Sequence, residues 1–145
     1  MLACLILPEF PLQLLLRRYP AWREHAVAVV DRDAAQGMIL WSNESARAHC
    51  ILPGMRYAAA LSLLPSLRAG EVPDNDVGSA IEALMDSLRF YTPDVEPSRD
   101  EPGVFWLGAS GLSLLYPSLA RCASLVRDEV ANAQFDATLV VGYSR

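Results

Sequence analysis

The stretch MLACLILPEFPLQLLLRR (1–18) decides the fold. Leu2–Leu7 is an apolar run of strand length, closed by a proline, and from Pro11 onward leucines recur at helical spacing. A buried strand that leads directly into a helix is the first half of an α/β unit. Chemistry is commonly carried at the carboxyl end of such a strand, because side chains there project into the crevice above the sheet. Leu7 and Glu9 occupy that place in this chain.

The composition favours one compact domain with a substantial core, since 52% of the 145 residues are hydrophobic. The formal net charge of −5 disfavours a general attraction to phosphate backbones.

The three cysteines are scattered without a CxxC pair, at Cys4, Cys50 and Cys122. We therefore expect reduced thiols that pack as small hydrophobic residues. The chain has no apolar run of membrane-spanning length and no basic signal-peptide start, which predicts a cytoplasmic protein without a membrane partner.

Along the first half of the chain, short apolar runs alternate with helical patterns. The sequence predicts strands at 26–30 and 38–41, a possible edge strand at 67–72, and a helix at 57–64. Asn43 is a good N-cap for a further short helix that carries Ala46 and Arg47. These two short helices are too slight to hold a core of their own, so we expect an inserted lobe.

In the second half, the clearest helix has Val77, Ile81, Leu84, Leu88 and Tyr91 on one stripe. A hairpin is predicted from 94–98 and 104–107, followed by a helix over 119–130 and a strand at 137–141. This order predicts an α+β fold, a mixed sheet with helices on one side and a small, mainly helical insert. Because the last strand is followed directly by the end of the sequence, we expect the amino-terminal part of a longer protein.

Few residues have the spacing that chemistry requires. Asp100 and Glu101 are adjacent carboxylates that could reach a divalent ion, but Pro102 and Gly103 follow them, and that composition is typical of an exposed hairpin turn. Arg47 is either a solvated side chain or a phosphate contact. The histidines are isolated, and the sequence contains neither common phosphate-binding glycine loop.

Three blocks together resemble the Y-family translesion DNA polymerases, and most closely their ImuB-type branch. They are LPEFPLQLLL (7–16), ILWSNESARAHCILPGMRYAAALSLLP (39–65), and SRDEPGVFWLGASGL (98–112) with ATLVVGYSR (137–145). The resemblance implies a first palm segment at 1–37, a fingers insert at 38–69 and a truncated second palm segment at 70–145. The thumb and little finger would lie beyond Arg145.

The resemblance also implies a degenerate active site. The family's D-x-D-x-F-F motif places its first metal-binding Asp at Leu7, its second Asp at Glu9 and its sugar-screening aromatic at Leu12. A leucine cannot coordinate Mg²⁺. The second acidic pair, an S-x-D-E segment, corresponds to Asp100 and Glu101, although alignment on the following strand would move the pair into a turn.

The fingers residues that hold the incoming triphosphate correspond to Glu44 and Arg47. The arginine is kept, whereas a carboxylate at position 44 would repel phosphates. These departures lead to the expectation of a pseudo-polymerase that is not an enzyme and binds no metal.

The ImuB-type branch implies a scaffold in damage-induced translesion synthesis. Its expected partners are an error-prone C-family DNA polymerase, a RecA-like accessory protein of the ImuA type, a sliding clamp bound through regions beyond this chain, and DNA bound through the thumb and little finger. Two alternatives remain at this point. One is an active polymerase with an altered Mg²⁺ site at Glu9, Asp100 and Glu101; the other is a nucleotide sensor that uses Arg47 without turnover.

Overall fold

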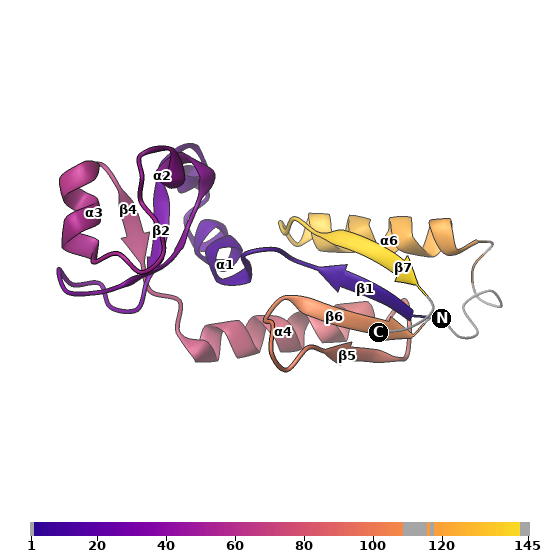
Figure 1. Ribbon diagram of the computed structural model, residues 1–145. Helices are drawn as coiled ribbons and strands as arrows, with labels where there is room; N and C mark the ends of the chain where they lie inside the picture. The colour runs from indigo at the N-terminus through magenta and orange to yellow at the C-terminus, as the bar shows by residue number, and fades with distance from the viewer. Residues whose placement is uncertain (1, 109–115, 117, 143–145) are drawn as a thin grey trace. The chain divides into compact units, whose positions relative to one another are not determined.

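The computed structural model describes residues 2–108, 116 and 118–142 (Figure 1). It divides into two compact units, which are considered separately. The four-stranded unit comprises residues 1–10 and 78–145, and the three-stranded unit comprises residues 11–77. Residues 109–112 and 143–145 of the motifs quoted above lie outside the described residues.

The four-stranded unit is built around β1 (Leu2–Ile6). Its sheet has the order β5-β6-β1-β7, with β5 at Val95–Pro97, β6 at Val104–Gly108 and β7 at Thr138–Gly142. Every neighbouring pair is antiparallel. The strand predicted at the start of the chain is therefore an inner strand, paired on both sides.

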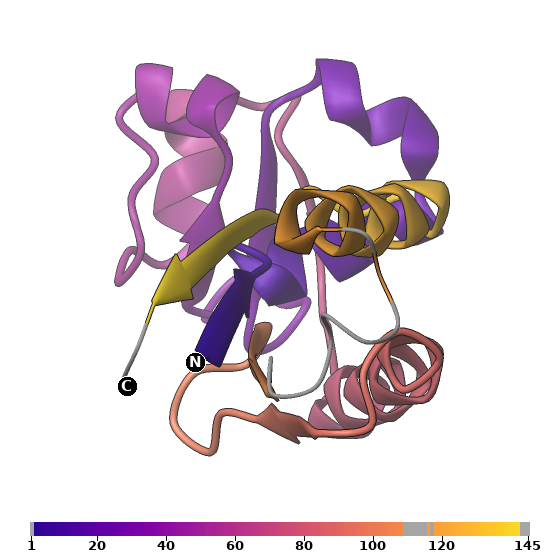
Figure 2. The ribbon, with the colours of Figure 1, turned by 90° about the vertical axis from the view of Figure 1, so that its right-hand side faces the viewer.

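One face of this sheet is covered by α4 (Asp74–Leu88) and α6 (Leu119–Asn132), which lie on the same side of it in Figure 2. The alternation along β1 and β6 buries Ala3, Leu5, Phe105 and Leu107, as expected for a sheet with one face on a core. The helices contribute further buried apolar side chains, namely Leu84, Leu88, Cys122, Val126 and Val130. Burial of each large side chain contributes about 2 kcal/mol.

The three-stranded unit has the order β3-β2-β4, with β3 at Ile39–Ser42, β2 at Val27–Val30 and β4 at Arg68–Gly70. β2 pairs antiparallel with β3 and parallel with β4. All four β2 residues are buried, because each face of the strand meets an apolar cluster. Ala28 and Val30 belong to one cluster with Ile39, Ala46, Ile51, Ala60 and Leu67, whereas Val27 and Val29 pack with Leu12 and Leu15.

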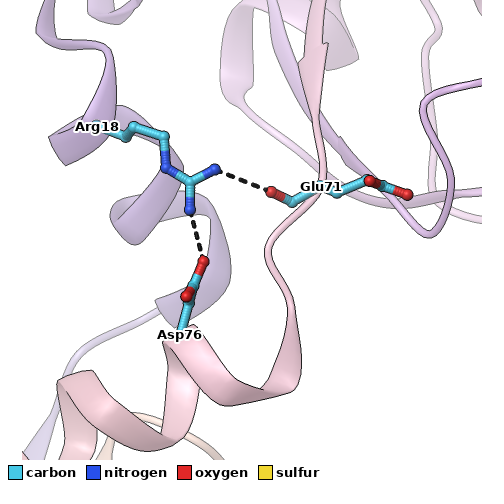
Figure 3. A network of polar contacts seen from close by, with 3 residues as sticks. All are labelled: Arg18, Glu71 and Asp76. Atoms are coloured by element: carbon cyan, nitrogen blue, oxygen red, sulfur yellow. Dashed lines mark hydrogen bonds and ion pairs between the residues drawn. The ribbon is translucent and has the colours of Figure 1, made fainter.

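The helices of this region are α1 (Phe10–Arg18), η1 (Pro20–Glu24, a 3-10 helix), α2 (Glu44–Ala48) and α3 (Tyr57–Leu63). The end of α1 is attached to the start of α4 through Arg18 (Figure 3). Its guanidinium contacts the Asp76 carboxylate at 2.7 Å and donates to the Glu71 carbonyl at 3.3 Å. Gly70 lies so close to α1 that a Cβ there would be 2.8 Å from Leu15 Cδ1.

The predicted α+β fold with helices packed on a mixed arrangement of strands is confirmed. The single sheet expected from the sequence is instead two sheets, because β2 pairs with β3 and β4 while β1 pairs with β6 and β7. The compact units divide at 10/11 and 77/78. The assignment of segments to palm and fingers stays a prediction.

The expectation that the cysteines pack as small hydrophobic residues is confirmed only in part. Of the cysteines, Cys122 is buried as expected, whereas Cys4 is half-buried and Cys50 is exposed. Among the described residues, no helix is both long enough and apolar enough to span a membrane.

Candidate functional site

The carboxyl end of β1 lies against the turn that joins β5 to β6. The Leu7 N–H donates a hydrogen bond to the Gly103 carbonyl at 2.8 Å. The Leu7 side chain is 1% exposed, so it belongs to the core of the four-stranded unit. Glu9 is half-buried and has a positive φ of 49°, at the point where the chain leaves the strand and enters α1. The structure thus places the chain after β1 against the turn that carries Asp100 and Glu101.

Gly103 makes this close approach possible. Its φ is +93°, which disfavours L side chains, and a Cβ there would be 2.7 Å from both the Leu7 carbonyl oxygen and Phe10 Cβ. The Phe10 ring packs in turn on Phe135, with 5.5 Å between ring centroids. A glycine is therefore required where the turn touches the end of β1.

Asp100 and Glu101 are exposed residues of this turn and do not belong to a strand. The turn is closed by the Ser98 N–H, which donates to the Val104 carbonyl at 2.8 Å, and by the Glu101 N–H, which donates to Ser98 Oγ at 3.3 Å. Pro102 and Gly103 lengthen the connection before β6 begins. The pair thus lies in a turn, as the turn composition predicts. Its correspondence to the family's S-x-D-E pair stays a prediction.

Glu101 nevertheless acts on a neighbouring strand. Burial raises the pKa of the Cys4 thiol, and the negative charge of Glu101 raises that pKa further. The Glu101 carboxylate is thus close enough to β1 for its charge to raise the pKa of Cys4.

The described residues do not fit the metal site that the family resemblance implies. Leu7 offers no donor atom, and Asp100 and Glu101 lie on the exposed turn. Within residues 2–108, 116 and 118–142, no three side chains of the His, Cys, Asp or Glu type converge as metal ligands. We therefore derive no metal-dependent step for this chain.

The other predicted site residues belong to the three-stranded unit. Leu12 is buried in the cluster with Leu15, Val27 and Val29, so it is a core residue. Glu44 and Arg47 lie on α2 and are exposed, and the Arg47 guanidinium donates a hydrogen bond to the Ser42 carbonyl. A contact of Arg47 with nucleotide phosphates stays a prediction.

Asn43 determines where α2 begins. Its Oδ1 accepts hydrogen bonds from the Ala46 N–H at 2.9 Å and the Val27 N–H at 3.0 Å, and its Nδ2 donates to the His25 carbonyl at 2.8 Å. The predicted N-cap is present. Its connection to β2 was not predicted, because nothing in the local pattern shows which strand lies beside the helix.

Comparison with solved structures gives matches over nearly the whole chain. The post-insertion binary complex of Dbh DNA polymerase matches with a TM-score of 0.80 and 15% identity, covering 97% of this chain and 41% of that one. DinB from Sulfolobus solfataricus matches with a TM-score of 0.76 and 14% identity, covering 99% and 42% respectively. The insertion ternary complex of Dbh DNA polymerase matches with a TM-score of 0.74 and 14% identity, covering 98% and 42%.

The chain thus spans about two-fifths of the length of these solved chains. At this level of identity, the likeness shows a shared fold. No curated protein matches the sequence.

These comparisons contradict the expectation that the chain is not an enzyme. The expectation rested on the absence of one carboxylate at Leu7, whereas the solved structures of the same fold include proteins described as DNA polymerases, one of them in an insertion ternary complex. The sequence profile of the IMS family, described as impB/mucB/samB, matches residues 5–145. The chain belongs to the impB/mucB/samB family of Y-family polymerase domains.

Proposed function

We propose that the protein acts in translesion DNA synthesis and mutagenesis induced by DNA damage, as a member of the ImuB-type branch. The observation that carries this proposal is Leu7, a buried apolar residue at the end of β1, in a chain that belongs to the impB/mucB/samB family. The resemblance of the three sequence blocks 7–16, 39–65 and 98–112 with 137–145 to the ImuB-type branch supports the same proposal. In this proposal, residues 1–37 and 70–145 form the palm, and residues 38–69 form the fingers insert.

Proteins are the partners that this chain's charge favours. With a net charge of −5, the chain as a whole repels phosphate backbones and is better suited to protein contacts. We therefore propose an error-prone C-family polymerase and a RecA-like accessory protein of the ImuA type as its partners. A sliding clamp and DNA would be bound through regions beyond Arg145. The place of action would be the cytoplasm, at the nucleoid.

Damage-induced mutagenesis tests the proposed role. The gene is deleted, cells are irradiated with ultraviolet light, and the frequency of drug-resistant mutants is counted with and without a plasmid that carries the full-length gene. We expect the induced frequency to fall towards that of unirradiated cells and to recover with the plasmid. An induced frequency that is unchanged by the deletion would rule out the proposed role.

Reconstitution tests the partners separately. Full-length protein is mixed with the purified C-family polymerase or with the RecA-like protein and analysed by size-exclusion chromatography. Co-elution at micromolar concentration is expected for at least one of them. Separate elution of every component would refute the partner assignment and leave the mutagenesis result as independent evidence on the role.

A further inference from the structure

The chain passes between its two compact units twice, each time within a helix. The first crossing lies between Phe10 and Pro11, in the first turn of α1. The second lies between Val77 and Gly78, inside α4. Pro11 has no backbone N–H to donate, and Gly78 has no side chain, so both differ from ordinary helix residues. Because each unit is compact, a rotation of one unit relative to the other has to occur at these two crossings.

The first crossing lies between two side chains that are buried in different cores. Phe10 is 1% exposed, and its ring packs on Phe135 in the four-stranded unit. Leu12 is buried with Val27 in the three-stranded unit. Pro11 alone separates these two anchors, and its nitrogen donates no hydrogen bond. The chain is thus fixed on both sides of Pro11, and this residue joins the two cores.

Helix α4 is also held at both ends, by different units. Val72, just before the helix, packs against the apolar cluster of the three-stranded unit. In the first turn, the Asp76 carboxylate contacts the Arg18 guanidinium at 2.7 Å (Figure 3). Leu84 and Leu88, further along the helix, are buried in the four-stranded unit. One continuous helix therefore belongs to two cores, and the second crossing lies between its anchors.

Packing does not explain the glycine at the second crossing. Nothing lies within 4 Å of the position that a Cβ of Gly78 would occupy, whereas a Cβ at Gly70 or Gly103 would approach other atoms to 2.8 and 2.7 Å. Glycine disfavours a helix relative to alanine because its backbone loses more freedom on folding, and Gly–Ser pairs are common at helix kinks. Gly78 and Ser79 thus make α4 easiest to bend where the chain crosses between the units.

We propose that Pro11 and Gly78 form a hinge about which the three-stranded unit rotates relative to the four-stranded unit. The first turn of α4 moves with the three-stranded unit, and the helix bends at Gly78. The bend disturbs neither core, because the anchoring side chains on each side of the hinge stay within their own unit. Rotations of this kind take place in microseconds to milliseconds, and a ligand that contacts both units would select one orientation. The inference rests on the connections between the units and does not depend on the translesion role.

Double electron–electron resonance between two spin labels measures this rotation in the full-length protein. One label is attached to the exposed Cys50 of the three-stranded unit, and the other to Arg127→Cys on α6 of the four-stranded unit. All other cysteines are replaced by alanine. A reference pair at Ala83→Cys and Arg127→Cys, with Cys50 also replaced, lies within the four-stranded unit. We expect a broader distance distribution for the pair that spans the hinge than for the reference pair.

Gly78→Ala tests whether α4 bends at Gly78. Alanine favours the straight helix, so the population of bent conformers should fall about fivefold and the distribution that spans the hinge should narrow. Glu82→Ala is the matched control, because it places alanine at an exposed position of the same helix beyond the crossing. It should leave the distribution unchanged. Urea unfolding confirms that each labelled variant is folded.

Two outcomes would overturn the proposal. The first is a distribution across the hinge as narrow as that of the reference pair, which would show that the two units form one rigid body. The second is a broad distribution that Gly78→Ala leaves unchanged in a folded protein, or that Glu82→Ala narrows equally, which would remove Gly78 from the hinge.

Discussion

The Leu7 N–H donates to the Gly103 carbonyl at 2.8 Å and so joins the end of the first strand to the turn that carries Asp100 and Glu101. The same glycine approaches the Leu7 carbonyl oxygen so closely that a side chain would not fit. A segment near residue 7 and a turn near residue 103 therefore form one structural unit.

Gly103→Ala should be among the more destabilising alanine substitutions in the chain. Its Cβ would be 2.7 Å from backbone and from Phe10, in a backbone conformation with φ of +93°. We expect the free energy of unfolding to fall by about 3 kcal/mol. Gly54→Ala is the matched control, because Gly54 has a φ of +94° and nothing within 4 Å of its Cβ position; its cost should be about 1 kcal/mol. Equal losses in urea unfolding would show that the close approach is unimportant.

Leu7→Asp places a carboxylate at the position that the family resemblance assigns to an aspartate, and this position is buried. The Leu7 side chain is 1% exposed, so we expect a loss of at least about 3 kcal/mol at neutral pH. Burial should raise the pKa of the new carboxyl group, so the loss relative to wild type should shrink as the pH falls. Leu52→Asp, at a residue that is 50% exposed, should cost about 0.5 kcal/mol or less. A Leu7→Asp variant as stable as wild type would show that this strand end is open to solvent or ligand.

Cys4 should react slowly with iodoacetamide, because burial and the charge of Glu101 both raise its pKa and so lower the thiolate fraction. Glu101→Gln removes the negative charge that raises the pKa of Cys4. It should therefore speed alkylation of Cys4 near pH 8, whereas Glu82→Gln should not. Because the folded-state pKa is raised, the contribution of this thiol to stability is present below about pH 8.5 and is lost as the pH rises through the folded value. Mass spectrometry of the labelled peptide measures the rate. An unchanged rate in Glu101→Gln would place this carboxylate away from β1.

Arg18 should contribute modestly to attaching α1 to the start of α4. Its partner Asp76 is 48% exposed, and Arg18 itself is 43% exposed, so solvent screens the pair. A double-mutant cycle of Arg18→Ala and Asp76→Ala should give a coupling of about 0.5 kcal/mol that decreases at high salt. The Arg89–Asp86 pair, at 3.3 Å on neighbouring turns, should give less. A coupling that salt does not change would contradict this electrostatic account.

Features that depend on neighbouring residues could be predicted from the sequence. The first strand, the Asn43 cap and the β5–β6 hairpin follow from apolar runs, cap chemistry and turn residues. Features that depend on distant pairing could not be predicted. β2 is a uniformly apolar run, which shows that it is buried but not that β3 and β4 flank it in a separate sheet. For the site, the sequence predicts that Leu7 lies at the end of the first strand, whereas its contact with Gly103 requires a register that local sequence does not specify.

Amide hydrogen exchange at Leu7 tests most directly whether the end of β1 is closed against the acidic turn. We expect the Leu7 amide to exchange only at the rate of large-scale opening, because its N–H is bonded to Gly103 beneath a buried side chain, while the amide of the exposed Arg99 exchanges rapidly. In Gly103→Ala, the Leu7 amide should lose much of this protection. Exchange of Leu7 in the wild type as fast as that of Arg99 would contradict the account.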